Sequence, residues 1–462
     1  MEKHNQSQYI KMTQTPVLPL IASLSVPTIL SMLVTNIYNL ADTAFVGQLG
    51  TAASGAVGIV FGYMAIIQAA GFMFGQGAGS IMARLLGARR VADAEKTAST
   101  AFFCSLISGG LIGLVSLIFL DPVVRVLGST ETIAPYARTY ILFIIASAPL
   151  MTASFTMNNL LRYDGKASLG MIGLMTGAVM NMVGDPILIF GLRMGIAGAG
   201  LSTALSQTAS FCILLSMFLR GKTTVGISLK RAEFLPARIF DICATGFPSM
   251  IRQALNALTT IVLNTCAKPY GDVAIAAMSI VSRISFFVFS IALGIGQGYQ
   301  PVSAFNFGAR KYGRLRKAFR VTAALSETVM LAGVVLVLAF SGNLIGTFRD
   351  DPEVIAIGTR ALRLHMLGML ALPFGMTVEM TLQSTGSRLA ASVLSSMRSG
   401  LFFIPLILIL SRLRGLAGIQ EAQPLAYILA TLWSLIFMKR FFGKIPLEDE
   451  DEEDRIVPAG QS

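Results

Sequence analysis

Long apolar runs separated by short polar segments dominate the chain. Twelve of these runs have about twenty or more mostly apolar residues, which is the length that an α-helix needs to cross a bilayer. They cover residues 17–44, 53–83, 97–120, 134–161, 167–191, 195–219, 239–267, 273–304, 318–345, 355–383, 389–411 and 415–438. Glycine and other small residues are dense within them, as close helix packing in lipid requires. The pattern predicts an all-α polytopic membrane protein with twelve transmembrane helices.

The runs form two copies of six. When the sequence is aligned with itself so that Pro27 matches Pro248, the same offset also pairs many other Gly, Pro and Arg positions. The other pairs are Gly50 with Gly271, Gly75-Gln76-Gly77 with Gly296-Gln297-Gly298, Gly87-Ala88-Arg89 with Gly308-Ala309-Arg310, and Gly165 with Gly386. An even number of spans in each copy makes the repeats parallel, and a substrate path is expected between them. Pro27 and its counterpart Pro248 are candidate bending points.

The duplication predicts the domain organisation. We expect an N-terminal lobe over 1–219, a basic cytoplasmic linker over 220–238, a C-terminal lobe over 239–442 and an acidic cytoplasmic tail over 443–462. Parallel lobes around a central path are typical of carriers, which rock one lobe against the other.

The composition is typical of a protein embedded in a lipid bilayer. The apolar fraction is 54%, the charged fraction is 13% and the mean hydropathy is +0.69, whereas a soluble domain carries about 25% charged residues. The net charge of +12 comes without a basic, aromatic-interleaved patch, so a nucleic-acid partner is not expected. With the N-terminus inside, 24 of the 36 basic residues fall in cytoplasmic segments, nine outside and three within spans. This bias predicts that both termini are cytoplasmic.

Cysteine and histidine offer little chemistry. The four cysteines (Cys104, Cys212, Cys243 and Cys266) lie in apolar runs, and His4 and His365 are the only histidines. We therefore expect no disulfide framework, no histidine-based metal site and no organic cofactor. No cleavable signal peptide is expected before the first span. An enzyme is disfavoured because reactive His, Cys or Ser constellations are absent from the sequence, and a channel because a filter sequence is absent.

Two carboxylates at membrane depth are candidate functional groups. Asp42 lies near the outer end of the first span and Asp185 in the outer half of the fifth. Asn181 precedes Asp185 by one helical turn and shares its face, and Thr203 lies at a similar depth in the sixth span. Charged residues are costly in lipid and rarely only structural. These oxygen ligands predict a site for H⁺ or Na⁺. A helix cap at Asp42 and a helix break at Pro186 are the structural alternatives.

The second lobe has different chemistry. Asp42 corresponds to Leu263, and the ionisable residues within its spans are Arg252, Arg283, Glu327, Glu379 and Arg398. We interpret most of them as interhelical ion pairs. Glu379, which matches Asn158 in the repeat, is expected to face the substrate cavity, with Gln383 near it.

Several motifs resemble a known family. They are Tyr38-Asn39-Leu40-Ala41-Asp42-Thr43-Ala44-Phe45-Val46-Gly47-Gln48-Leu49-Gly50, Asn181-Met182-Val183-Gly184-Asp185-Pro186-Ile187-Leu188-Ile189-Phe190-Gly191, Gly195-Ile196-Ala197-Gly198-Ala199-Gly200, and the Leu86-Gly87-Ala88-Arg89 loop with its repeat. The chain is similar in them to the MATE (multidrug and toxic compound extrusion) family, nearest its prokaryotic DinF-like and MepA-like branches.

The resemblance implies a V-shaped, two-lobed exporter driven by inward flow of H⁺ or Na⁺. It implies a cation-coupling site, or Na⁺ site, at Asp42, Asn181, Asp185 and Thr203, with Tyr38, Tyr140 and Asn158 lining the same cavity. Asn158 stands where some relatives have a glutamate that contacts cationic drugs, so a strict preference for cations is not implied.

The expected function is therefore antiport of amphipathic, mostly cationic organic compounds by a monomer in the inner membrane of a prokaryote. A flippase of lipid-linked oligosaccharides or other amphiphiles is the alternative. That function is expected to show two further helices or a strongly cationic central cavity, and Arg252, Arg283 and Arg398 keep it open.

Overall fold

The computed structural model describes residues 2–449, and every regular element in that range is helical. The first group of helices is α1 (Glu2–Gln14), α2 (Val17–Gly47), α3 (Thr51–Gly87), α4 (Val91–Ile118), α5 (Leu120–Val126), α6 (Ala134–Tyr163), α7 (Ala167–Pro186), η1 (Ile187–Gly191) and α8 (Ile196–Leu219). After η2 (Leu229–Arg231) come α9 (Pro236–Ala267), η3 (Lys268–Tyr270), α10 (Gly271–Gly308), α11 (Tyr312–Ala339), α12 (Ser341–Phe348), α13 (Pro352–Met369), α14 (Leu372–Ser384), α15 (Arg388–Ser396), η4 (Met397–Leu401), α16 (Phe403–Arg414) and α17 (Leu416–Lys444). The part of the predicted acidic tail beyond residue 449 lies outside the described residues.

The spans agree with the predicted polytopic fold. Within residues 2–449, ten helical stretches are long and apolar enough to cross a membrane. One of them, Pro236–Gly308, has 73 residues, which is about 110 Å of helix and far more than one bilayer, so α9 and α10 are two spans. The α13–α14 pair is bent by 48° and forms one broken span, with Pro373 in the first turn of α14. Counted in this way, the described chain has twelve spans.

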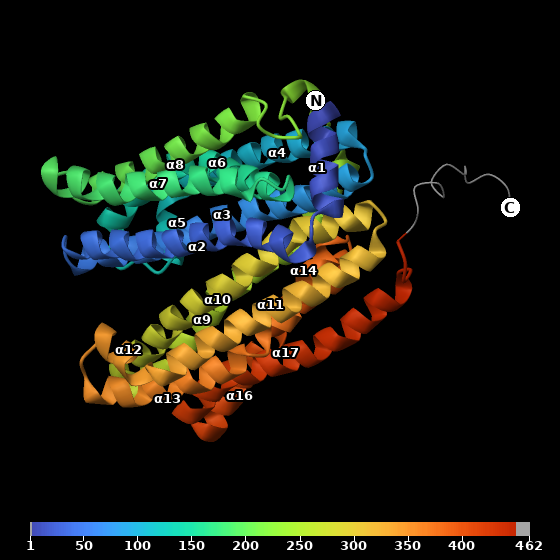
Figure 1. Ribbon diagram of the computed structural model, residues 1–462. Coiled ribbons are helices and arrows are strands. Elements are labelled where there is room, and N and C mark those ends of the chain that lie inside the picture. The colour runs from blue at the N-terminus through green and yellow to red at the C-terminus, as the bar shows by residue number, and fades with distance from the viewer. Residues whose placement is uncertain (1, 450–462) are drawn as a thin grey trace.

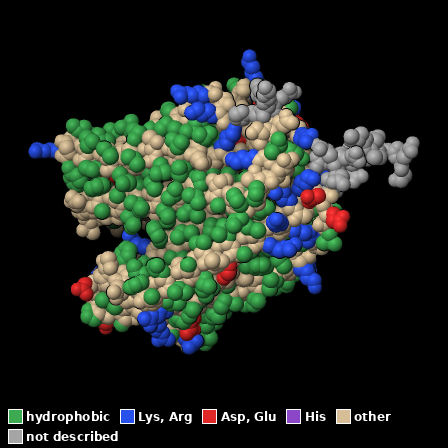
Figure 2. Space-filling view, in the orientation of Figure 1, with side chains coloured by type: hydrophobic (Ala, Val, Ile, Leu, Met, Phe, Trp, Pro, Cys, Tyr) green, Lys and Arg blue, Asp and Glu red, His purple; other side chains and the backbone are tan. Residues whose placement is uncertain are grey.

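The helices form two lobes that meet at one end only (Figure 1). Helices α2 to α8 make the first lobe and α9 to α17 make the second. We call the end where the lobes meet, and where α1 lies, the joined end, and the opposite end the open end. Figure 2 shows the surface hollowed between the lobes at the open end, apolar side chains over the flanks of both lobes, and many Lys and Arg side chains at the joined end. The flanks are therefore suited to lipid.

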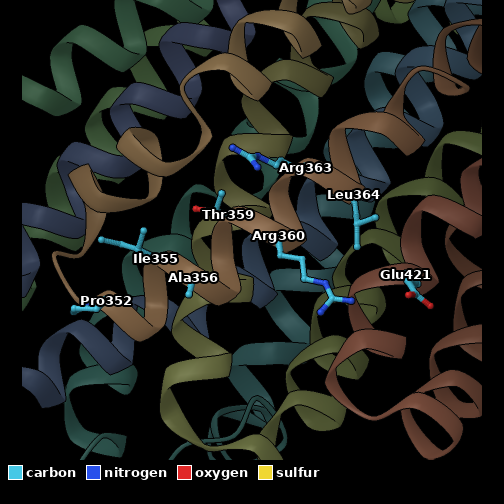
Figure 3. Close-up of a pocket in the computed structure, with 8 residues that line it drawn as sticks. All are labelled: Pro352, Ile355, Ala356, Thr359, Arg360, Arg363, Leu364 and Glu421. Atoms are coloured by element: carbon cyan, nitrogen blue, oxygen red, sulfur yellow. The ribbon is translucent and has the colours of Figure 1, made fainter.

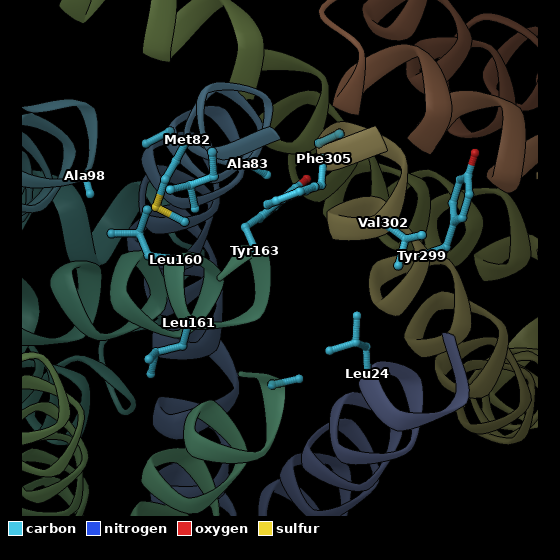
Figure 4. Close-up of a cluster of buried hydrophobic side chains, with 14 of the residues drawn as sticks. Leu24, Met82, Ala83, Ala98, Leu160, Leu161, Tyr163, Tyr299, Val302 and Phe305 are labelled. Atoms are coloured by element: carbon cyan, nitrogen blue, oxygen red, sulfur yellow. The ribbon is translucent and has the colours of Figure 1, made fainter. Parts of the chain in front are cut away.

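The hydrophobic core follows this division. One cluster of buried side chains lies wholly in the first lobe, between Val46 and Ala199, and another wholly in the second, between Leu263 and Tyr427. A third contains side chains from both lobes at the joined end, among them Leu24 and Leu161 beside Val302 and Phe305 (Figure 4). The lobes thus share a core at the joined end and have separate cores elsewhere.

The backbone repeats the sequence duplication. Arg89 and Arg310, which the duplication pairs, both have positive φ, 60° and 57°, a conformation that is uncommon for residues other than glycine. Gly165 and Gly386, at the same offset, have φ values of 72° and 90°. The same positive φ angles at one offset confirm two copies of one structural unit.

Candidate functional site

The predicted polar residues of the first lobe meet inside it, toward the open end. Asp42 lies near the end of α2, Asn181 and Asp185 lie on α7, and Thr203 lies on α8; each is at most 2% exposed. Asn181 donates its Nδ2 hydrogens to Asp185 Oδ1 and to Thr203 Oγ1, both at 3.3 Å. The carboxyl groups of Asp42 and Asp185 are near enough for the charge of Asp185 to act on Asp42. Two like charges this near in a buried site favour protonation of one of them.

Three oxygen atoms of this cluster are unsatisfied. Asp42 Oδ1, Asp185 Oδ2 and Asn181 Oδ1 are buried and find no hydrogen-bond partner among residues 2–449. Buried acceptors are normally paired, and three unpaired oxygens together are chemically suited to a proton or a hard cation. The described residues contain no group of three or more His, Cys, Asp or Glu suited to a metal ion. A cation held here would bind amide and hydroxyl oxygens as well as the two carboxyls.

Aromatic residues border the cluster. Tyr140 on α6 is fully buried, and its hydroxyl lies 3.4 Å from Thr203 Oγ1. Tyr38 is one helical turn before Asp42 on α2 and is half-buried. Asn158, also half-buried, packs against α7, where a Cβ atom on Gly170 would lie 2.4 Å from its Oδ1. Ser202, which was not predicted, also belongs to the cluster: its Oγ lies 3.4 Å from Asn181 Nδ2.

The second lobe has a different arrangement. Glu379 on α14 pairs with Arg252 on α9, with 2.8 Å between Oε1 and Nη1, and it accepts a hydrogen bond from Ser395 at 2.6 Å. Glu379 is only 4% exposed, so in this conformation its carboxylate faces Arg252 and Ser395, and its contact with substrate stays a prediction. Gln383 is also buried and bonds to Ser249 and Gln300.

Both candidate hinge residues are prolines within a continuous helix. α2 continues through Pro27 and α9 through Pro248, and both residues are buried. Ser31 donates a hydrogen bond to the Pro27 carbonyl oxygen, a local contact that often accompanies a bend.

Backbone contacts without intervening side chains hold the joined end together. A Cβ atom on Gly77 of α3 would lie 2.0 Å from the carbonyl oxygen of Ile242 on α9. A Cβ atom on Gly246 of α9 would lie 1.8 Å from the carbonyl oxygen of Met73 on α3. Real Cβ atoms do not approach so closely, so only glycine permits this packing.

The N-terminal helix α1, which the sequence did not predict, lies across the joined end. Gln8 donates to the Asp164 carbonyl oxygen of the first lobe at 2.7 Å. Met12, fully buried, accepts hydrogen bonds at its carbonyl oxygen from Asn306 and Arg314 of the second lobe, both at 3.2 Å. Burial raises the pKa of the Asp164 carboxyl, and the nearby ammonium group of Lys166 opposes that shift. Because α1 contacts both lobes, it connects them at the joined end.

A surface hollow of about 800 Å³ lies between α13 and the start of α17 (Figure 3). Its lining includes Arg360, Arg363 and Glu421, but none of the predicted site residues. The predicted substrate path is therefore not this hollow.

Comparison with known proteins identifies the class. The MatE family model matches residues 27–187 and 248–409, and the two matches begin at Pro27 and Pro248, a pair that the duplication relates. The multidrug export protein MepA of Staphylococcus aureus (strain MSSA476) is 27% identical over 437 residues, covering 94% of this chain and 96% of that protein. MepA of Staphylococcus haemolyticus (strain JCSC1435) is 28% identical over 396 residues, covering 86% of this chain and 87% of its own length.

Solved structures give the same result. A multidrug resistance MATE family transporter of the MOP superfamily in an outward-facing conformation superposes with a TM-score of 0.88 and 25% identity, covering 94% of this chain and 98% of that one. Two repeated lobes of membrane-spanning helices around buried polar groups define a multi-pass membrane transporter rather than an enzyme. The chain belongs to the MatE family.

Proposed function

We propose that this protein is a cation-coupled antiporter that exports amphipathic organic compounds by alternating access between its two lobes. The observation that carries the proposal is the buried Asp42–Asp185 pair, with its unsatisfied oxygens, beside the open end. The names of the similar MepA proteins and of the MATE structure support drug export as the task.

The coupling step follows from the chemistry of the pair. Asp42 and Asp185 take up H⁺ or Na⁺ when the open end gives access to them, with Asn181 and Thr203 supplying neutral oxygens. Two carboxyls this close exchange protons as a unit, so a change in water access changes the charge of the whole site. Uptake favours release of the substrate, and return of the empty carrier releases the cation on the other side. No organic cofactor takes part, and the carrier acts as a monomer.

Orientation in the inner membrane follows from charge. The joined end, where Lys and Arg gather (Figure 2), is the cytoplasmic end under the rule that cytoplasmic loops are basic. Both termini are then cytoplasmic and the open end faces outward.

A lipid-linked oligosaccharide flippase is less favoured. The described residues hold twelve spans and no further pair, and of the three arginines that kept this alternative open, the buried Arg252 is paired with Glu379.

The test is to remove the exchangeable charge. Asp42→Asn and Asp185→Asn keep nearly the shape of the carboxyl but cannot exchange a proton, and they weaken a Na⁺ site. In proteoliposomes, each variant is expected to lose export driven by an imposed pH or Na⁺ gradient, down to the level of liposomes without protein. Leu263→Asn, at the position that matches Asp42 in the second lobe, is the control and retains coupling. Gradient-driven export near the parent rate in both Asp→Asn variants would disprove this coupling site.

A further inference from the structure

Arg283 is an exposed charge at membrane depth. It is the thirteenth residue of α10, about 18 Å along the helix from its start at Gly271, and its side chain is exposed. An arginine in contact with lipid at this depth costs several kcal/mol, so arginines in spans normally face a protein interior or a water-filled space. Since Arg283 is not buried, a water-filled space is the favourable neighbour.

The contacts of α10 show which way this residue faces. Ser290, Gly294 and Gly298 recur at four-residue spacing and all contact α2. Asn36 donates to Ser290 Oγ at 3.0 Å, and a Cβ atom on Gly294 would lie 2.5 Å from Ile29. Arg283 precedes Ser290 by seven residues, or two helical turns, and therefore shares that face. It is directed toward α2 and the first lobe.

The register of the two helices gives the residues opposite Arg283. Gly298 of α10 contacts Ser25 of α2, Gly294 contacts Ile29, and Ser290 contacts Asn36. The residue numbers therefore decrease along α10 as they increase along α2. The helices are thus antiparallel, and two further turns bring Arg283 opposite residues 40–43. Leu40, in that stretch of α2, is 46% exposed. Figure 2 shows Lys or Arg atoms on the wall of the hollow between the lobes.

The guanidinium group is not neutralised by the protein. Arg283 makes no ion pair with any residue from 2 to 449. Glu379 is held by Arg252 and Ser395, and Asp42 and Asp185 are buried inside the first lobe. Glu327 on α11 is half-buried and has no ion pair with it. The hollow therefore presents a free cation on the second lobe, opposite the helix that carries Asp42.

We propose that Arg283 binds the anionic group of the exported compound, so that the substrates include amphipathic molecules with a carboxylate as well as a cationic or aromatic part. This assignment rests on the proposed export function and adds a residue that recognises one part of the substrate. The planar guanidinium fork binds a carboxylate through two parallel hydrogen bonds, which an ammonium group does not reproduce. The cationic part of such a molecule lies toward α2, the first-lobe helix that carries Asp42. Bound in this way, a zwitterion spans the hollow.

The experiment uses two dyes that differ only in the anion. Tetramethylrhodamine has a free carboxylate, and its methyl ester does not. Export of each is measured in proteoliposomes containing the full-length parent, Arg283→Gln, Arg283→Lys or Arg412→Gln. The last is a control at an exposed arginine on α16 that has no ion pair with residues 2–449. Arg283→Gln is expected to raise the KM for the free acid about tenfold or more, as loss of a hydrogen bond to a charged group does. Its KM for the ester changes by less than about twofold. Arg283→Lys is expected to recover part of the loss, and Arg412→Gln to behave as the parent.

Other outcomes overturn the assignment. Equal loss of both dyes in Arg283→Gln assigns the residue a structural role, and unchanged kinetics for the free acid remove the contact. A parent that exports the ester but not the acid refutes this substrate class while leaving the export function intact, whereas a parent that exports neither dye argues against the export function itself. Translocation of fluorescent phosphatidylglycerol is followed in the same liposomes. If only that lipid responds to Arg283→Gln, the anionic group belongs to a lipid headgroup and the dye assignment is wrong.

Discussion

Replacing Gly77 with alanine should weaken the joined end of the transporter. A Cβ atom at this position would lie 2.0 Å from the Ile242 carbonyl oxygen and 2.9 Å from the Gly246 backbone nitrogen, both on α9. No side chain can rotate away to relieve these contacts, because both belong to backbone. The methyl group therefore forces α3 and α9 apart by about 1 Å, and overpacking of this kind costs about 1–3 kcal/mol.

The added methyl group destabilises only the conformation in which α3 and α9 are in contact. In a state whose lobes have parted at the joined end, α3 and α9 no longer touch and the methyl group is accommodated. A bias of about 1–3 kcal/mol changes the ratio of the two states roughly 5- to 150-fold in favour of that state. Gly58→Ala on the same helix is the matched control, since nothing lies within 4 Å of its Cβ position and alanine favours helix by about 1 kcal/mol.

The assay is a distance measurement between the lobes at the open end. Spin labels are attached to cysteines introduced at Thr130 and Asp350, in the loops of the two lobes, after removal of the four native cysteines. Gly77→Ala is expected to enrich a population with a shorter distance across the open end, while Gly58→Ala keeps the parent distribution. Identical distributions in the two variants, with equal export rates, would show that the glycine contact does not control the joined end.

Three further predictions concern α1, the second-lobe ion pair and the topology. Deleting residues 2–14 should raise the reactivity of cysteines placed at the joined end, because α1 connects the lobes; unchanged labelling would contradict that role. Glu379→Gln should lower the free energy of unfolding by about 3–5 kcal/mol, since it leaves Arg252 buried without a counter-charge. Adding Arg252→Met should recover most of this loss. An unchanged melting temperature would refute the pairing. Impermeant thiol reagents should label the loop at 121–133 from outside and the loop at 84–96 only after permeabilisation, and the reverse pattern would invert the topology.

The sequence predicts the spans well and the short helices poorly. The run at 239–267 corresponds to α9 (Pro236–Ala267), since length and hydropathy suffice to define a membrane helix. By contrast, α1 has a polar composition and is held mainly by contacts that its own residues make with both lobes, such as those of Met12. Such contacts join segments about 150 to 300 positions apart, and local pattern contains no information about them.

The candidate site, too, could be predicted only in part from the sequence. Asn181 and Asp185 could be grouped because they are one turn apart on one helix, and Asp42 and Thr203 because they lie at the same depth. The pairing of Glu379 with Arg252 joins residues 127 positions apart, so the sequence predicts ion pairs in the second lobe but not which residues are partners. For the same reason, Gln383 could be named but its hydrogen bonds to Ser249 and Gln300 could not.

The two copies of the duplication share the glycine contacts at the joined end but differ in their acidic residues. A Cβ atom on Gly87 would lie 2.1 Å from the Phe305 carbonyl oxygen, and one on Gly308 would lie 2.0 Å from the Arg84 carbonyl oxygen. The offset of the duplication turns each of these contacts into the other, so the joined end is symmetric. In this conformation the close contact requires glycine in both copies. The acidic residue is not symmetric, because Asp42 corresponds to Leu263 in the second lobe. Under the proposed mechanism one coupling site is enough, so the second lobe can differ at this position.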